Sequence, residues 1–209
     1  MIMNFLAHLY LSGKEEDVII GNFVADAIKG NSLHRFPEGM ERGIRLHREI
    51  DHYTDSHPVF KTSRSRLVPT YRMYAGVIVD LYYDHFLARY WDEYSDEDLS
   101  QFVASTYFLM IRRFNLLPLR SRRILPFMIT QNWLVNYRDL NSLQRVFYGM
   151  SRRTSHPSGM ENAIRDLESG YDMFENEFRA FFPEIIKHID NYRSNLQAGS
   201  SSIVKNCLS

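Results

Sequence analysis

Histidines and aspartates recur at helical spacing in the first 85 residues, and these side chains are the ones best suited to do chemistry. His47 and Asp51 are four residues apart, so both leave the same face of a helix, and Asp55 extends that row by one turn. Asp80 and Asp84 repeat the four-residue spacing further along the chain. The pattern predicts two helix faces that carry carboxylates.

The surroundings of these residues are apolar, which makes their polarity unusual. Asp80, Asp84 and the adjacent His85 lie in the run VIVDLYYDHFL, and His8 and Asp26 each lie in another apolar segment. A buried carboxylate requires a cation, because removing an unpaired charge from water costs several kcal/mol. Lysine is scarce in these segments.

Two interpretations apply to this set of residues. Taken singly, each histidine or aspartate is more often a satisfied core residue, paired with an arginine or capping a helix. Taken together, they match the mixed oxygen and nitrogen shell that manganese, iron or magnesium prefers, rather than zinc–thiolate chemistry. The spacing predicts a divalent metal and leaves the reaction open. The other histidines are interpreted as surface, capping or packing residues: His34, His52, His57, His156 and His188.

Apolar residues recur at three- and four-residue steps along almost the whole chain, and no alternating run indicates a strand. The sequence therefore predicts an all-α protein of eight or nine helices in a single domain over residues 1–196, with a flexible tail over 197–209. Helices are expected before residues 12 and 30, and over 37–57, 58 onward, 74–94, 95 onward, 121–138, 141–153 and 160–181, with a last one starting at Pro183. Ser95 and Asp98 form the pattern of a capping box.

The composition excludes several classes of protein. Of the 209 residues, 44% are hydrophobic and 24% charged, which is typical of a globular chain and not of a disordered one. The only cysteine is Cys207, so neither an internal disulfide nor a zinc–thiolate cluster can form, and a reducing compartment such as the cytoplasm is favoured. No segment approaches the roughly 20 apolar residues of a membrane span.

The charges balance overall but not locally. The 25 basic and 25 acidic residues cancel, so neither nucleic acid nor a membrane surface is expected as a partner. Residues 99–138 nevertheless contain no acid and carry Arg112, Arg113, Arg120, Arg122, Arg123 and Arg138. This stretch is either a solvated face with counter-charges on other helices or a docking patch for an acidic partner or a phosphate-bearing substrate.

Five ordered segments resemble the acyl carrier protein phosphodiesterases, also called holo-carrier-protein hydrolases. They are MNFLAHLYLS at 3–12, GNFVADAIKG at 21–30, GIRLHREID at 43–51, DHFLARYW at 84–91 and WLVNYRD at 133–139. The resemblance covers most of residues 3 to about 190. It implies removal of 4′-phosphopantetheine from the serine of holo acyl carrier protein, with manganese as the favoured metal and magnesium or iron as alternatives.

The resemblance also implies a divergent helical fold, distantly similar to the HD phosphohydrolases. Those enzymes carry an adjacent His-Asp pair, whereas this chain has the reversed order Asp84-His85, and its other pair is split as His47 and Asp51. Positions inside or one turn from the matching segments are the expected metal ligands: Asp26, His47, Asp51, Asp80 and Asp84.

In the expected mechanism, the metal activates a water and binds a phosphoryl oxygen. His85 or His8, where it is not a ligand, donates a proton to the departing serine oxygen. Arg48 holds a second phosphoryl oxygen, or is an exposed helix arginine. Arg120, Arg122 and Arg123 steer the acidic carrier, whose docking then weakens with salt.

Two other functions stay open at this point. The metal centre could act on a nucleotide or another small phosphoester. Alternatively, the chain is a metal-free helical adaptor for an acidic partner, with its inward acids paired to Arg45, Arg48 or Arg89. Metal analysis of the purified protein separates the adaptor from the enzymes. The oligomeric state is not indicated.

Overall fold

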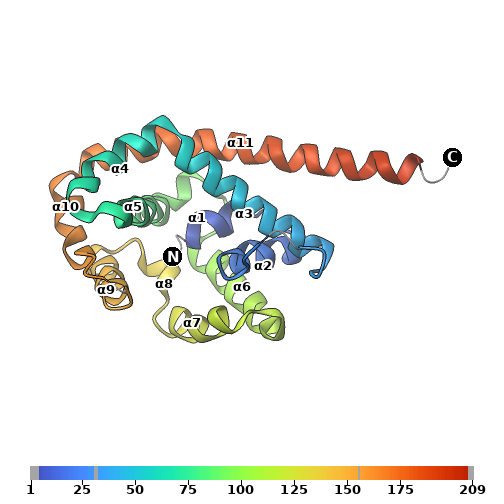
Figure 1. Cartoon of the computed structure of the whole chain (residues 1–209), viewed down its shortest axis with the longest axis horizontal. Coiled ribbons are helices and arrows are strands. Elements are labelled where there is room, and N and C mark those ends of the chain that lie inside the picture. The colour runs from blue at the N-terminus through green and yellow to red at the C-terminus, as the bar shows by residue number, and fades with distance from the viewer. Residues whose placement is uncertain (1–4, 31–32, 155, 207–209) are drawn as a thin grey trace.

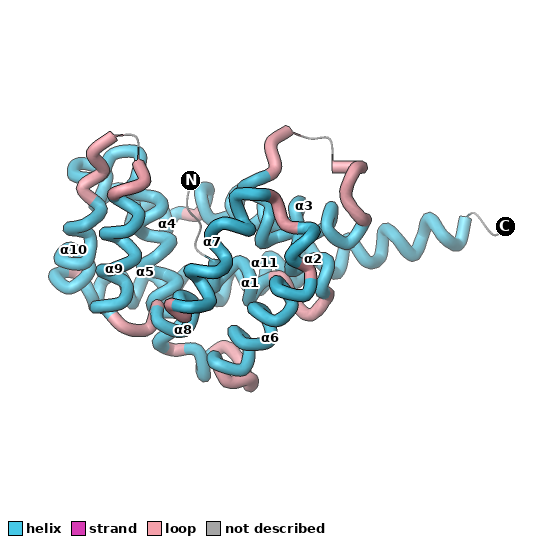
Figure 2. Tube along the Cα trace, turned by 90° about the horizontal axis from the view of Figure 1, so that it is seen from below, coloured by secondary structure: helices cyan, strands magenta, loops and turns pink. Residues whose placement is uncertain are grey.

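The computed structural model describes residues 5–30, 33–154 and 156–206, with side chains up to residue 195. Helices make up nearly all of this part, and loops only connect them (Figure 2). The all-α prediction is confirmed. The helices are α1 (Phe5–Leu11), α2 (Glu16–Val24), α3 (Glu38–Ser56), α4 (Pro58–Tyr71), α5 (Ala75–Arg89), α6 (Leu99–Arg112), α7 (Leu119–Thr130), α8 (Trp133–Asn136), α9 (Leu140–Ser151), α10 (Ala163–Ser169) and α11 (Tyr171–Asn206).

This is more than the eight or nine helices predicted, because two expected helices are divided. The helix expected over 121–138 is interrupted at Asn132, whose φ of 46° is left-handed, so α7 and α8 are separate. The helix expected over 160–181 is interrupted at Gly170, which ends α10 and precedes α11. A helix can end at a residue in the left-handed conformation or at a glycine, with no proline to mark the end. The periodicity of apolar residues alone does not detect such helix ends.

Two predicted helix starts are wrong. Pro183 lies inside α11, where it has no N–H to donate to the preceding turn. The buried rings of Phe181 and Phe182 hold the helix against the core at this point. The helix expected at Ser95 begins at Leu99 instead. Its cap is Asp98, whose carboxylate accepts the N–H groups of Ser100 and Gln101 at 2.8 and 3.1 Å.

The end of α11 reaches into the segment predicted as a tail. Figure 1 shows this helix extending beyond the other helices toward the C-terminus. Backbone helix continues to Asn206, and residues 207–209 lie outside the described residues. The mobility of residues 197–209 stays a prediction.

Helices α2 and α3 cross very closely, and this crossing positions several polar side chains. A Cβ atom at Gly21 would lie 2.2 Å from the carbonyl oxygen of Met40, and one at Gly43 would lie 2.2 Å from that of Val18. Only glycine permits such an approach of two backbones. The crossing therefore packs α2 against the first two turns of α3.

Helix α1 is fixed against α5 by one aspartate. The two carboxylate oxygens of Asp84 accept the N–H groups of Leu6 and Ala7 at 3.0 and 2.8 Å. These N–H groups belong to the first turn of α1, where the helix itself offers no carbonyl to accept their hydrogen bonds. Figure 1 shows α1 in the middle of the molecule, between α3 and α5.

The core beneath these helices is rich in aromatic rings. Phe86 of α5 stacks on Phe178 of α11, with centroids 5.8 Å apart, and Phe178 stacks on Phe182 at 5.0 Å. Within the described ranges, no helix combines the length and apolar character needed to cross a membrane.

Candidate metal centre

His8, His47 and Asp51 converge where α1, α3 and α5 meet. One ligand atom from each lies within 4.8 Å of the other two. The imidazole centroids of His8 and His47 are 4.2 Å apart. Asp51 reaches both rings, with Oδ1 3.3 Å from Nε2 of His8 and Oδ2 3.3 Å from Nε2 of His47. This arrangement is a His-His-Asp set able to hold a metal ion.

A further carboxylate, Asp26, contacts the same centre, and the charge of Asp80 interacts with it. Oδ1 of Asp26, just after α2, lies 3.3 Å from Nε2 of His47. Asp80 of α5 is half-buried, and its pKa is raised well above the usual value, first by burial and then by the charges of Asp51, Asp84, Asp55 and Asp26. Within the described part of the chain, no lysine or arginine pairs with Asp26, Asp51 or Asp80. Among the described residues, these acids thus converge without a lysine or arginine to balance their charge.

Asn22 sets the orientation of both imidazoles. Its Nδ2 donates to the carbonyl of His8 at 3.0 Å and to Oγ of Ser12 at 2.8 Å, so its Oδ1 must face the other way. That oxygen lies 3.1 Å from Nδ1 of His8 and 2.9 Å from Nδ1 of His47. An amide oxygen only accepts, so both Nδ1 atoms carry hydrogen and both Nε2 atoms face the carboxylates.

The protonation of the metal-free centre follows from these contacts. Burial lowers the pKa of His47, but hydrogen bonds and charges from Asp26 and Asp51 outweigh it and raise this pKa to about 9. Burial raises the pKa of Asp51, but the two imidazoles outweigh it and hold the value well below the usual range. Burial and the neighbouring His47 lower the pKa of His8. A proton on His47 therefore supplies positive charge between the carboxylates.

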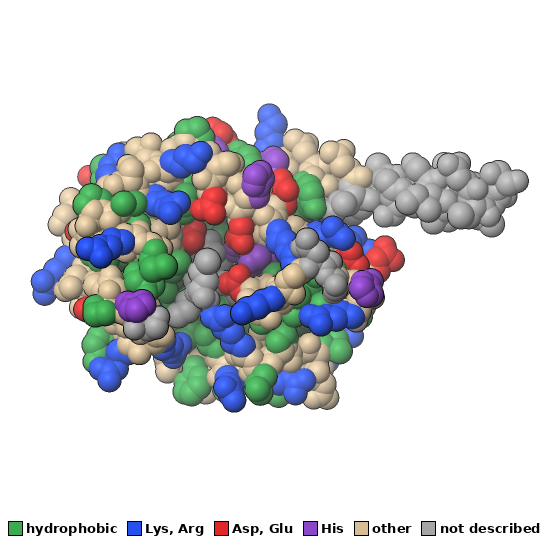
Figure 3. Space-filling model, in the orientation of Figure 1, with side chains coloured by type: hydrophobic (Ala, Val, Ile, Leu, Met, Phe, Trp, Pro, Cys, Tyr) green, Lys and Arg blue, Asp and Glu red, His purple; other side chains and the backbone are tan. Residues whose placement is uncertain are grey.

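The donor set fits a divalent ion. Two Nε2 atoms and the oxygens of Asp51 and Asp26 are the nitrogen and oxygen ligands that manganese, iron and magnesium accept. Acidic and histidine side chains gather near the middle of the face shown in Figure 3, with basic side chains around them. Such a set leaves coordination positions for water and for substrate oxygen.

Asp84 and His85, both predicted as site residues, are held by other partners. Both oxygens of Asp84 bind the backbone of α1, and burial raises its pKa to about 7. Nδ1 of His85 donates to the carbonyl of Tyr137, and its Nε2 lies 2.8 Å from the hydroxyl of Tyr171. Burial lowers the pKa of His85 to about 4. In the described part of the chain, neither Asp84 nor His85 forms a hydrogen bond with the imidazole of His8 or of His47.

The predicted arginines divide into tethered and exposed ones. Nη2 of Arg48 donates to the carbonyl of Gly30 at 2.7 Å. The guanidinium of Arg122 donates to the carbonyls of Leu117 and Asn115 and so braces the loop before α7. Arg120 and Arg123 are exposed on the same helix. Elsewhere in this stretch, Arg112 and Arg113 pair with Glu16 of α2, as the interpretation of a solvated face with distant counter-charges predicts.

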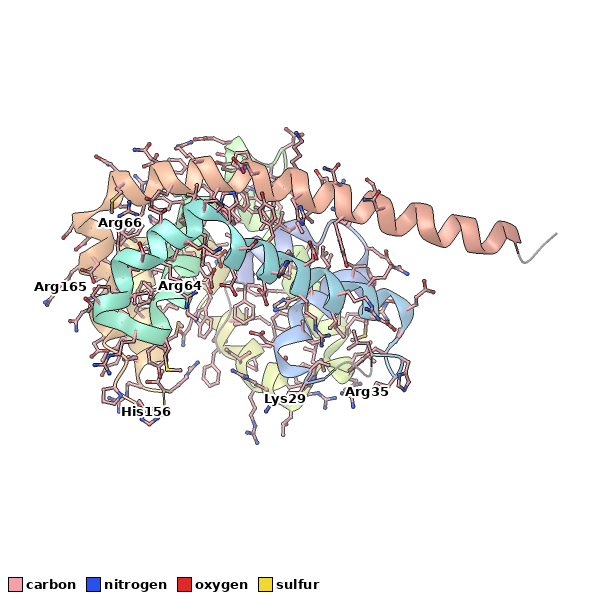
Figure 4. The ribbon with its side chains drawn as sticks, turned by 45° about the horizontal axis from the view of Figure 1, so that its top comes forward. Lys29, Arg35, Arg64, Arg66, His156 and Arg165 are labelled. Carbon is pink, nitrogen blue, oxygen red and sulfur yellow. The ribbon has the colours of Figure 1, made fainter. Side chains whose placement is uncertain are left out.

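Sequence reasoning missed two residues at or near the centre. Asn22 was detectable, because it is a polar residue in an apolar run and stands four positions before Asp26. Arg64 of α4 carried no signal. Its Nε is buried beside Gly76 of α5 and has no hydrogen-bond partner in the described part of the chain. Figure 4 shows Arg64 on the inner side of α4 and Arg66 on the outer side.

Comparison with known proteins agrees with this arrangement. A family model for acyl carrier protein phosphodiesterase matches residues 3–185. The chain is 32% identical over 190 residues to the acyl carrier protein phosphodiesterase of Enterobacter sp. (strain 638), covering 90% of this chain and 98% of the relative. It is 34% identical over 185 residues to that of Escherichia coli O139:H28, covering 88% and 96%. No solved structure matches significantly, so kinship with the HD phosphohydrolases stays a prediction. The match over nearly its whole length shows that this chain belongs to the acyl carrier protein phosphodiesterase family.

Proposed function

We propose that the protein hydrolyses the phosphodiester between 4′-phosphopantetheine and the serine of holo acyl carrier protein. The oxygen of water bonds to phosphorus, the bond from phosphorus to the serine oxygen breaks, and that oxygen takes a proton. The observation that carries the proposal is the convergence of His8, His47, Asp51 and Asp26, with which no lysine or arginine of the described ranges pairs. Relatives named acyl carrier protein phosphodiesterase support the choice of substrate.

The ligands that we assign are His8, His47, Asp51 and Asp26, with Mn²⁺ as the favoured ion and Mg²⁺ or Fe²⁺ as alternatives. Such an ion supplies a Lewis acid for a phosphoryl oxygen and lowers the pKa of bound water toward neutrality. Asn22 keeps the two Nε2 atoms directed at it. The charge of Asp80 interacts with those of Asp51 and Asp26, and Asp80 is the group that we assign to exchange a proton with the attacking water.

The remaining predicted roles fit less well with the contacts. A ligand role for Asp84 and proton donation by His85 stay predictions, and the hydrogen bonds of both residues do not favour them. Because His8 is assigned as a ligand, its role as proton donor is not part of this proposal. A phosphoryl contact by Arg48 also stays a prediction. Arg64 is an additional choice, because its buried Nε has no hydrogen-bond partner among the residues that the structure describes, and Gly76 beside it is one helical turn before Asp80.

The carrier would meet the exposed arginines of α7. Arg120 and Arg123 present positive charge that an acidic carrier complements, whereas Arg122 is engaged with backbone carbonyls and supports the loop. The single cysteine is consistent with action in the cytoplasm.

The test is to incubate holo acyl carrier protein with the purified protein and MnCl₂ and to measure the carrier's mass. We expect loss of the phosphopantetheine mass, with none in EDTA and none with an Asp51→Ala variant. Release of phosphate from nucleotides while the holo carrier stays intact would instead favour a nucleotide phosphohydrolase. A protein that binds no metal and leaves both substrates intact would favour the adaptor.

A further inference from the structure

An apolar groove begins on α5 about one helical turn before Asp80. It encloses about 820 Å³ between α5, α7 and α9, and Val77, Ile124, Phe127 and Met150 are among its lining residues. Val77 precedes Asp80 by three residues, so both side chains project from the same side of α5. The groove therefore continues the face that carries the carboxylates.

The groove walls include large apolar side chains that are exposed to solvent. Met73 is 74% exposed, Leu119 64% and Phe127 53%. Arg120, Arg123 and Arg153 also line the groove, and no acidic residue is among the described lining residues. Exposed apolar surface next to a polar centre is typical of a ligand site.

We propose that this groove binds the pantetheine arm of the substrate, with the phosphate end of the arm at the metal centre. The inference rests on the proposed function and adds where the cleaved group lies. Beyond its phosphate the arm is an uncharged chain of methyl, methylene and amide groups with one hydroxyl and a terminal thiol, which suits an apolar wall with few polar contacts. The arginines of the groove then face the acidic carrier to which the arm is attached.

The volume favours the arm over a helix of the carrier. Sites for small flexible molecules enclose about 300–1,000 Å³, and this groove falls within that range. A helix with its side chains is about 10–12 Å across and requires a long open channel. The continuity with Asp80 also gives the arm a direct path to the reacting phosphate.

The test uses free 4′-phosphopantetheine as the probe, because this molecule has the arm and lacks the carrier. Calorimetry with the Mn²⁺-loaded protein measures its affinity in the parent and in Phe127→Glu, which puts a charge on the groove wall. We expect about tenfold weaker binding in this variant, because a charge on the wall would lose hydration beside the apolar arm. Met73→Glu is a second variant at an even more exposed position.

Phe108→Glu is the matched control. Phe108 is 66% exposed on α6, is not a groove residue, and undergoes the same change of side chain. We expect it to bind the probe as the parent does. Equal affinities for Phe127→Glu and Phe108→Glu would overturn the inference.

Steady-state cleavage of the holo carrier separates the remaining outcomes. In Phe127→Glu, we expect a higher KM together with the weaker binding of the probe. A higher KM with unchanged probe affinity would assign the groove to the carrier protein itself and overturn the inference. If the parent does not cleave the holo carrier, the proposed function fails first; if the parent cleaves it but the groove variants behave as the parent does, only the groove assignment fails.

Discussion

The described part of the chain contains a buried imidazole pair, His8 and His47, and a separate buried imidazole, His85, and the sequence does not distinguish them. Around His8 and His47, the Nδ1 atoms share one amide oxygen and the Nε2 atoms face carboxylates. Around His85, one ring nitrogen meets a carbonyl and the other a tyrosine hydroxyl. Burial alone therefore does not make a buried histidine a ligand: the partner of its second nitrogen decides.

The largest expected effect comes from removing the shared carboxylate of the first group. Asp51→Ala should lower metal-dependent turnover by about a thousandfold. The substitution removes the carboxylate that contacts both imidazoles and that we assign as a ligand of the ion. Turnover and Mn²⁺ affinity are measured together with helicity by circular dichroism. Asp190→Ala, at an exposed position of α11, is the control and should behave as the parent does. Activity within about tenfold of the parent would count against Asp51 as a ligand.

Asn22→Ala tests whether orientation of the imidazoles matters. We expect about 10–100-fold weaker Mn²⁺ binding, the range typical of a residue that orients ligands. In the metal-free protein, nitrogen NMR of the imidazoles should show loss of the single Nδ1–H tautomer of His8. The control Asn136→Ala removes an amide that bonds only the carbonyl of Gln131. An unchanged tautomer and an unchanged metal affinity in Asn22→Ala would remove this role.

The two groups should respond to pH in opposite directions. The pKa of His47 is about 9, above the 6.5 of an unfolded histidine, so its contribution to stability is complete below pH 6.5 and is lost as pH rises to 9. The pKa of His85 is about 4, so the unfolded chain binds the extra proton between pH 4 and 6.5. Its contribution is present above pH 6.5 and is lost as pH falls to 4.

Urea unfolding of the metal-free parent, His47→Gln and His85→Gln measures this difference. The free energy that His47 adds over glutamine should fall by about 1–3 kcal/mol from pH 6.5 to 9, with half-exposed Asp51 reducing the effect. The free energy that His85 adds should rise by a similar amount from pH 4 to 6.5. If the free energies that His47 and His85 add changed with pH in the same direction, the two environments would not differ as described.

A smaller effect is expected from the inward arginine of α4. Arg64→Gln should raise KM for the holo carrier or lower kcat by about tenfold, because a phosphoryl oxygen loses a charged donor. Arg66→Gln is the matched control on the same helix, since its guanidinium pairs with Glu177 on the outer side. Equal kinetics for the two variants would leave Arg64 without a role in catalysis.

The smallest effect concerns docking. Raising salt should increase KM about two- to fivefold, because exposed charges are screened beyond about 8 Å at physiological ionic strength. Arg120→Gln with Arg123→Gln should flatten that dependence. If KM of the parent does not change with salt, Arg120 and Arg123 do not form a docking surface for the carrier.

The sequence predicts the helical fold and several residues of the candidate metal centre, because both depend on local spacing. His47 and Asp51 share a face by their four-residue separation, and the structure places His8 and Asp26 beside them. Asp84 is different: the same spacing relates it to Asp80, but its partners are the N–H groups of Leu6 and Ala7. Only a contact across nearly eighty residues distinguishes the two, and spacing along one helix contains no such information.

Helix ends were the other feature that the sequence did not predict correctly. Asn132 and Gly170 break regular apolar patterns through backbone conformation, whereas Pro183 is tolerated inside a helix that the core supports. Arg64 was missed because the order of residues does not reveal what surrounds its side chain. Only the structure shows that its buried Nε lacks a hydrogen-bond partner among the described residues.

The attachment of α1 to Asp84 has a consequence for assembly. A helix of seven residues does not persist alone in water, so His8 reaches its place only when this segment docks on α5. Half of the imidazole pair thus depends on a docking contact rather than on the stability of its own helix. A substitution of Asp84 would therefore disturb the candidate centre although its carboxylate bonds none of the assigned ligands.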